Sequence, residues 1–158
     1  MILILTQCFP SRVGGIESLV SNLALELAKT EKVLVFADQH NIFLDSIYDN
    51  QNKNRIIIRR TSGIKFFRRR KKINEIKKIA DLNKIKLIIA DSWKSLELGI
   101  DFFNLKNIPS ICLAHGNDLI PDNEKKGNRM KITLSKANSI ICNSSFTTGL
   151  VKKLLPNN

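Results

Sequence analysis

Short apolar runs alternate along the chain with segments in which apolar residues recur every three or four positions. The short runs predict buried strands, and the periodic segments predict amphipathic helices. The strands expected are residues 3–6, 33–37, 55–59, 87–90, 110–114 and 139–142. The helices expected are residues 16–29, 66–83, 95–104, 124–136 and 145–155. Residues 38–54 are polar and interrupt the alternation, so we expect a long loop there, with one short helical turn that contains Phe43 and Tyr48.

The order of these elements predicts an α/β fold: a Rossmann-like, mostly parallel sheet flanked by helices. A strand, a helix and a strand at the start of the chain form a βαβ unit with parallel strands. A chain of 158 residues is long enough for one such domain and too short for two ordinary ones. No apolar run approaches the roughly 20 residues of a membrane span. No signal-peptide pattern precedes the first strand, so we expect a cytoplasmic protein.

The chain is strongly basic, with a net charge of +12 from 26 basic and 14 acidic residues. Such a charge indicates an anionic partner, although a bias toward Lys, Asn and Ile in the coding sequence would also produce it. Five cations crowd the start of the helix at residues 66–83, where they oppose the helix dipole: Arg68, Arg69, Arg70, Lys71 and Lys72.

Phe66 and Phe67 precede this basic run. Aromatic side chains beside cations are typical of a segment that rests on anionic lipid headgroups, which would place the protein on the inner face of a membrane. The alternative is a solvated helix face whose two Phe side chains lie in the core. The sequence leaves both interpretations open.

The three cysteines, Cys8, Cys112 and Cys142, are odd in number and irregularly spaced, which fits neither a disulfide framework nor a metal site. The only histidines are His40 and His115, so no histidine-rich metal site is available. We therefore expect no metal, and we expect two of the cysteines to be small core residues.

Gly14 and Gly15 lie between the first strand and the first helix. Glycine permits backbone conformations closed to residues with a Cβ, and the free amides at a helix start carry the positive end of its dipole. A strand, a glycine turn and a helix start together form an anion site, most often for phosphate. The alternative is a tight turn without a ligand.

Polar clusters also follow three other strands, at residues 91–93, 115–118 and 143–145. The carboxyl ends of parallel strands meet at one edge of the sheet, where ligands bind in such folds. His115 can donate a hydrogen bond or exchange a proton near neutral pH. Asp91 and Asp118 can bind hydroxyl groups, and Trp93 can stack on a sugar ring, although Asp118 also suits a turn and Ser144 a helix cap. Neither a P-loop nor a dinucleotide fingerprint is present.

Three motifs in order resemble family 4 glycosyltransferases. The first is Pro10-x-x-x-Gly14-Gly15-Ile16-Glu17 ahead of an apolar helix. The second is His115-Gly-Asn-Asp118 after a strand, and the third is Lys-Ala-Asn-Ser-Ile-Ile-Cys-Asn-Ser over residues 136–144. Each motif is short, but their order and spacing cover nearly the whole chain.

This resemblance implies one half of a GT-B architecture and sugar transfer with retention of anomeric configuration. It implies that Gly14 and Gly15 approach the diphosphate of a nucleotide-sugar donor and that His115 contacts the transferred sugar as the catalytic residue. We add Asp91, Trp93, Asp118 and Ser144 as contacts of the acceptor or the cleft. The family works without a bound metal or other cofactor, and many members act on lipid-linked or cell-envelope glycans.

The motifs of a second, nucleotide-sugar domain do not occur. We therefore expect residues 1–158 to be the N-terminal, acceptor-side half of the enzyme, inactive without its C-terminal half. The alternative is a non-enzymatic basic α/β module that binds nucleic acid or another polyanion. We do not expect nucleic acid, because the chain has no RNA-binding aromatic motif and no zinc finger.

Overall fold

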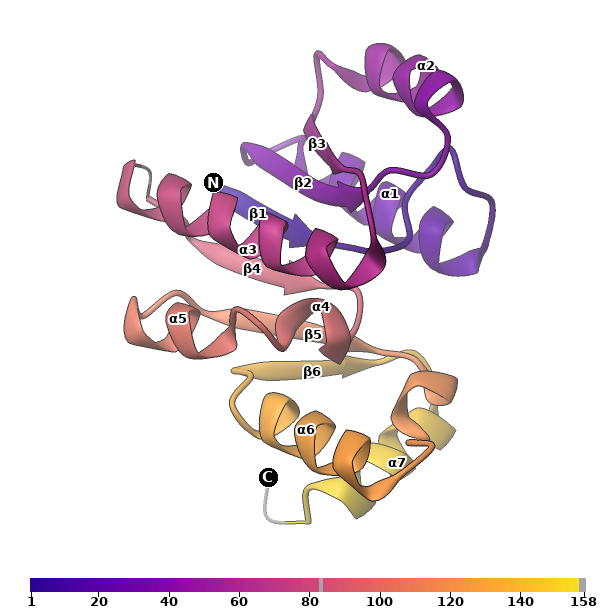
Figure 1. The fold of residues 1–158 in the computed structure, drawn as a ribbon, viewed down its shortest axis with the longest axis vertical. Helices are drawn as coiled ribbons and strands as arrows, with labels where there is room; N and C mark the ends of the chain where they lie inside the picture. The colour runs from indigo at the N-terminus through magenta and orange to yellow at the C-terminus, as the bar shows by residue number, and fades with distance from the viewer. Residues whose placement is uncertain (83, 157–158) are drawn as a thin grey trace.

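The computed structural model describes residues 1–82 and 84–156. Its six strands form one sheet in the order β3-β2-β1-β4-β5-β6, and all neighbouring pairs are parallel (Figure 1). The predicted α/β class is therefore confirmed. The strands are β1 (Ile2–Leu5), β2 (Val33–Asp38), β3 (Ile57–Thr61), β4 (Leu87–Ala90), β5 (Ser110–Ala114) and β6 (Ser139–Cys142).

The strand order reverses between β1 and β4, which is the switch point where open α/β sheets bind ligands. The helices between the strands are α1 (Gly15–Leu27), α2 (Ile42–Asn52), α3 (Lys65–Leu82), α4 (Trp93–Leu96), α5 (Ile100–Leu105) and α6 (Glu124–Ser135). A 3₁₀ turn, η1 (Gly116–Leu119), follows β5, and a last helix, α7 (Ser145–Leu154), follows β6.

Three parts of the chain show the main differences from the sequence prediction. The expected loop at residues 38–54 contains α2, a helix of 11 residues, because Asn41 caps its start by accepting from the amides of Phe43 and Leu44. The third strand begins at Ile57 and runs through two arginines, since it pairs with β2 from that residue on. The helix expected at residues 95–104 is split into α4 and α5. The expected helix end at Asn83 lies outside the described residues.

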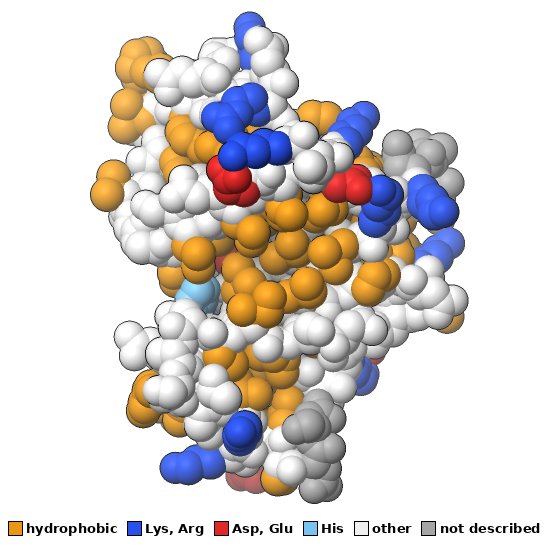
Figure 2. Space-filling view, turned by 180° about the vertical axis from the view of Figure 1, so that it is seen from behind, with side chains coloured by type: hydrophobic (Ala, Val, Ile, Leu, Met, Phe, Trp, Pro, Cys, Tyr) orange, Lys and Arg blue, Asp and Glu red, His pale blue; other side chains and the backbone are white. Residues whose placement is uncertain are grey.

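The two faces of the sheet are covered unequally. Val20 and Ala24 of α1 and Tyr48 of α2 pack on one face, whereas the apolar residues of α3 to α7 pack on the other. On the α1 side, no described helix covers β5 and β6, and Ile141 is half-exposed. Figure 2 views this side and shows a broad band of apolar side chains across its middle.

A buried carboxylate, Asp45, ties α2 to the loop after β1. Its two oxygens accept from the amide and hydroxyl of Ser11 (3.3 and 2.8 Å) and from the amides of His40 (2.8 Å) and Asn41 (3.1 Å). Arg60 of β3 completes the cluster with an ion pair to Asp45 at 3.2 Å. This cluster explains why α2 and the loop that leads to Gly14 hold fixed positions relative to each other.

We predict that Asp45→Asn lowers the free energy of unfolding by about 2 kcal/mol near neutral pH, because the amides lose their charged acceptor and Arg60 keeps only its pairing with Asp49. Burial by itself raises the pKa of Asp45, but the hydrogen bonds from Ser11 and His40 and the charge of Arg60 outweigh it and hold the pKa below its usual value. This stabilisation is present above the unfolded-state pKa of about 4 and is lost as the pH falls through the lower folded-state pKa.

Urea unfolding of both proteins near neutral pH and at about pH 3 measures this difference, which should shrink at acid pH. Asp101→Asn is the matched control, because Asp101 forms an exposed ion pair with Lys136 and should contribute less than about 0.5 kcal/mol. A difference between wild type and Asp45→Asn that does not change with pH would contradict the role of the Asp45 charge.

Candidate functional site

Two adjacent hollows lie at the edge of the sheet where the strands end. The glycine–histidine pocket, of about 590 Å³, is lined by Gly15, His115 and Ser144, among others. The switch-point pocket, of about 400 Å³, is lined from the ends of β1, β2 and β4. Ile16 and Asp118 line both pockets, which makes the two hollows neighbours. Figure 2 shows the molecule notched at this edge, with a histidine side chain in the notch.

The glycine–histidine pocket brings Gly15 and His115 together, as the sequence predicts. The Nε2 atom of His115 is buried and has no hydrogen-bond partner among the described residues. A buried ring nitrogen without a partner is costly, and a ligand in the pocket could satisfy it. Gly116 lines the same pocket, and a Cβ there would lie in ordinary contact with the ring of Phe146. The geometry fits a ligand contact for His115, and its catalytic role stays a prediction.

The two glycines differ in what surrounds them, and neither adopts a left-handed backbone conformation, since Gly14 is fully extended. Our expectation that they supply special backbone conformations is therefore wrong. A Cβ on Gly14 would overlap the carboxylate of Glu17, which is buried and pairs with Arg12 at 2.9 Å. A Cβ on Gly15 would meet nothing within 4 Å. Gly15 lines the glycine–histidine pocket, whereas Gly14 lines neither pocket. The predicted phosphate contact is therefore kept for Gly15 and the backbone amides beside it and is dropped for Gly14.

Glu17 is a residue whose importance the sequence analysis missed. Its carboxylate lies in the first turn of α1, where the positive end of the helix dipole favours an anion. It therefore occupies part of the anion site that the glycine turn was expected to offer to a phosphate. The Gly-Gly-x-Glu spacing could have indicated this role, because in the first helical turn the side chain at position 17 points back toward position 14.

Ser144 acts as the N-cap of α7, accepting from the amide of Thr147 at 3.1 Å. The helix-capping interpretation is thus confirmed, and Ser144 lines the glycine–histidine pocket as well. Phe146, an exposed residue that the sequence analysis did not single out, lines the same pocket. An exposed aromatic ring at this position can stack on a sugar or a base.

Trp93 does not have the exposed ring that we expected. Its side chain is only 2% exposed, and its indole N–H donates to the carbonyl of Asp118 at 2.9 Å. The prediction that Trp93 stacks on a sugar is therefore wrong, since both faces of a buried ring are already in contact. Lys94 pairs with the Asp118 carboxylate at 3.0 Å, so the cluster after β4 is joined to the cluster after β5.

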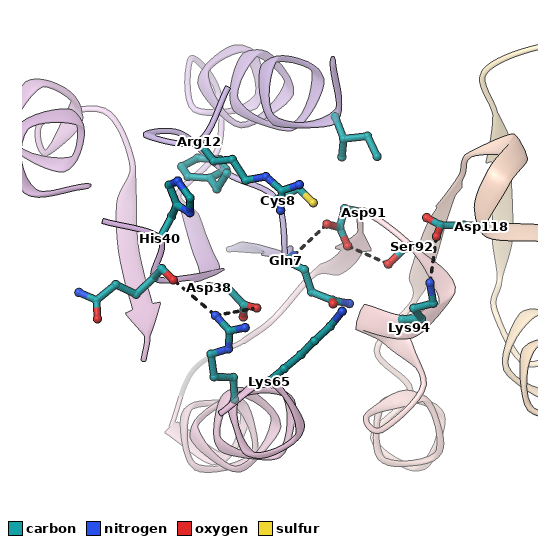
Figure 3. Close-up of a pocket in the computed structure, with 14 residues that line it drawn as sticks. Gln7, Cys8, Arg12, Asp38, His40, Lys65, Asp91, Ser92, Lys94 and Asp118 are labelled. Atoms are coloured by element: carbon teal, nitrogen blue, oxygen red, sulfur yellow. Dashed lines mark hydrogen bonds and ion pairs between the residues drawn. The ribbon is translucent and has the colours of Figure 1, made fainter. Parts of the chain in front are cut away.

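Asp91 lies at the switch point and lines the pocket there, but its carboxylate is buried and already satisfied. It accepts from the Thr6 hydroxyl (2.7 Å), the Gln7 amide (2.9 Å) and the hydroxyls of Ser92 (3.1 Å) and Ser95 (2.5 Å). Figure 3 shows the bond from Gln7 to Asp91 at the floor of the pocket. These four hydrogen bonds give Asp91 a structural role. A contact between Asp91 and acceptor hydroxyl groups would have to compete with them.

Cys8 also lines the switch-point pocket. Burial, together with the nearby charges of Asp91 and Glu17, raises the pKa of its thiol to about 11. A thiol with such a pKa is protonated at neutral pH and is a poor nucleophile. The arrangement therefore offers no thiolate chemistry at this position.

The cations of the basic run at the start of α3 differ in burial: some are buried in ion pairs, and others are exposed. Lys72 is buried, and its ammonium lies 2.6 Å from the Asp38 carboxylate and donates to the Thr6 carbonyl at 2.7 Å. Arg68 pairs with the other oxygen of Asp38 at 3.4 Å. Lys72 therefore cannot touch a membrane surface, and this part of our prediction is wrong.

The remaining cations of the run are partly exposed. Arg69 shares the carboxylate of Glu97 with Arg129, at 2.5 Å from each. Arg70 and Lys71 are the exposed members of the run. The side chain of Phe66 lies outside the described part of the structure, whereas Phe67 is exposed rather than in the core. A membrane contact by Arg70 and Lys71 stays a prediction.

Lys65, the first residue of α3, was also missed by the sequence analysis. It lines the switch-point pocket together with Arg12 and His40. Figure 3 shows the Lys65 side chain extending into the hollow toward Gln7. Cations on opposite walls of one pocket favour a ligand that carries negative charge.

Within residues 1–82 and 84–156, no group of three or more His, Cys, Asp or Glu side chains is arranged to hold a metal ion. In the same part of the chain, no helix is both long enough and apolar enough to cross a bilayer.

Comparison with known proteins gives a family and a fold. A family model described as Glycosyltransferase Family 4 matches residues 13–157. The structure of Alr3699/HepE from Anabaena in complex with UDP superposes with a TM-score of 0.66 at 16% identity, over 97% of this chain and 40% of HepE. The structure of HepE with UDP-glucose gives a TM-score of 0.64 at 17% identity, over 98% of this chain and 40% of HepE.

The apo form of the lipopolysaccharide outer core galactosyltransferase WaaB is also similar, with a TM-score of 0.64 at 15% identity. That match covers 98% of this chain and 43% of WaaB. The chain thus spans about two fifths of the length of these structures. A search of the curated proteins finds no match.

We predict that Gly14→Ala and Gly15→Ala have opposite effects on stability. A methyl group at Gly14 must displace the buried Glu17 carboxylate, which should cost about 1–2 kcal/mol. A methyl group at Gly15 enters open space at the start of α1 and should be neutral or stabilise by up to about 1 kcal/mol. Urea unfolding compares the two variants, and equal destabilisation by both would contradict the assigned surroundings.

Proposed function

The chain belongs to glycosyltransferase family 4, and from that premise we propose that it is the acceptor-side half of a retaining GT-B enzyme. In this proposal the complete enzyme transfers a sugar from a nucleotide-sugar donor to a glycan or lipid-linked acceptor. The observation that carries the proposal is the shared pocket of Gly15 and His115 at the carboxyl ends of the strands. Residues from all three motifs by which the chain resembles the family line this pocket, since Ser144 belongs to it as well.

The nucleotide-sugar donor is supported by the HepE structures, which are complexes with UDP, with UDP-glucose, and with UDP and glucose. We propose that the donor diphosphate lies against the amides at Gly15, with the transferred sugar beside His115. The buried and unpartnered Nε2 of His115 supports a hydrogen bond to that sugar. The proposed chemistry uses no metal or other cofactor, since preorganised hydrogen bonds stabilise the charge that develops on the leaving group.

The acceptor is assigned to the switch-point pocket, which adjoins the donor pocket through Ile16 and Asp118. Arg12 and Lys65 on its walls support an acceptor that carries a phosphate or a carboxylate. The similarity to WaaB, a lipopolysaccharide outer core galactosyltransferase, supports a role in cell-envelope glycan synthesis. An enzyme of this kind would act in the cytoplasm at the inner face of the membrane, with Arg70 and Lys71 toward anionic lipid.

We predict that the isolated 158 residues show no sustained sugar transfer, because the nucleotide of the donor is held by a second domain. Joining the chain to the part of HepE that follows the matched segment should restore transfer from UDP-glucose. His115→Ala should then lower kcat/KM of the hybrid by about 100-fold or more, as expected for loss of one preorganised hydrogen bond in the transition state.

Asn74→Ala, at an exposed position of α3, is the control and should leave the rate unchanged. UDP binding shows whether the HepE part of each hybrid is folded. Sustained transfer by the isolated chain would contradict the assignment as a half-enzyme. A folded hybrid whose rate does not depend on His115 would contradict the assigned role of that residue.

A further inference from the structure

Three consecutive strand-to-helix junctions expose large apolar side chains. Val13 follows β1 and is 95% exposed, and Ile64 follows β3 and is 71% exposed. Ile42 and Phe43 start α2 and are 75% and 69% exposed. Leu44 and Phe67 complete the set, which we name the apolar edge. Because β1, β2 and β3 are parallel neighbours, all three junctions lie at the same edge of the sheet.

The junctions are joined to one another by hydrogen bonds. The Ser11 hydroxyl donates to Asp45 at 2.8 Å, which connects the first junction to α2. The amide of Gln39 donates to the carbonyl of Thr61 at 3.0 Å, which connects the second junction to the third. The three junctions are therefore held to one another at one edge, and Figure 2 shows apolar side chains protruding at the end of the molecule that carries α2.

The charges of this surface are arranged for an anionic partner. Its carboxylates are buried and paired: Glu17 with Arg12 and Asp45 with Arg60. Arg12 remains about half exposed, at 54% of its side chain, and Lys65 is exposed on the opposite wall of the switch-point pocket. In the described residues of the three junctions, the exposed formal charges are thus cationic. Exposed apolar side chains accompanied by these two cations are suited to an anionic lipid surface.

We propose that the apolar edge docks the protein on an anionic bilayer, with Ile42 and Phe43 inserted among the headgroups. This rests on the membrane partner of the proposed function and moves the main contact from Arg70 and Lys71 of α3 to the start of α2. The switch-point pocket opens at the same edge, since Arg12, His40 and Lys65 line it. A lipid-linked acceptor would therefore reach the pocket from the bilayer without leaving it.

Co-sedimentation of the 158-residue protein with vesicles tests the docking. We expect binding to vesicles of phosphatidylcholine with phosphatidylglycerol as a minority component, and much weaker binding to phosphatidylcholine alone. The double variant I42S/F43S should lower the partition coefficient by about tenfold or more, because two apolar side chains no longer enter the lipid. The variant R70Q/K71Q should have a smaller effect.

Leu105→Ser is the matched control, because Leu105 is 79% exposed at the end of α5, on the opposite edge of the sheet. It should bind like wild type. Binding that falls equally for I42S/F43S and Leu105→Ser, or that depends only on Arg70 and Lys71, would overturn the proposal. So would a concentration-dependent dimer in lipid-free solution that I42S/F43S abolishes. Vesicle binding is measured without any sugar transfer, so its failure and the failure of the proposed activity are distinguishable.

Discussion

A buried ammonium group holds together the region on which the site depends. Lys72 of α3 lies where β1 and β2 end, with its side chain 5% exposed, and its charge is satisfied by Asp38 at 2.6 Å and by the Thr6 carbonyl at 2.7 Å. A buried charge that loses its partner costs several kcal/mol. The crossover helix α3 therefore cannot shift relative to the two strand ends, and the switch point beside them keeps its shape.

The polar and glycine residues at the strand ends fall into two groups, those whose side chains are buried and paired and those that face a pocket. Asp38, Asp45 and Asp91 are buried and satisfied inside the protein, where they hold loops and helix starts in place. Gly15 and His115 are left facing a pocket, and the buried Nε2 of His115 lacks a partner among the described residues. The first group stabilises the loops and helix starts at this edge of the sheet, and the second group can contact a ligand. In the proposed function, the glycine–histidine pocket holds the donor phosphates, and the adjoining switch-point pocket holds the acceptor.

Much of the fold could be predicted from the sequence, because it follows from local patterns. Five of the six strands fall within one residue of their predicted limits, since short apolar runs in a parallel sheet are buried on both faces. The convergence of Gly15 with His115 also follows from the topology alone. For α2, only one short helical turn was predicted, because the start of the helix is stabilised by Asn41 and by the tertiary partners of Asp45, which no local apolar pattern reveals.

The roles of individual side chains were harder to predict. Trp93 follows the end of a strand, a position where ligand-binding residues are common. Its indole N–H nevertheless donates to the carbonyl of Asp118 in η1, and its ring packs in the core. The run from Arg68 to Lys72 has the composition of a solvated or lipid-facing surface, but three of its members pair with Asp38 or Glu97 from distant parts of the chain. Such pairings depend on which helix face meets which strand end, and sequence spacing does not determine that.

Our central proposal is that a sugar diphosphate binds between the first turn of α1 and the loop after β5. Mapping amide shifts of the ¹⁵N-labelled protein by NMR during titration with UDP-glucose tests it most directly. We expect weak binding, with shifts concentrated at Gly15, Ile16, His115, Gly116 and Asn117. Shifts confined to the exposed cations of α3, with none at Gly15 or His115, would contradict it.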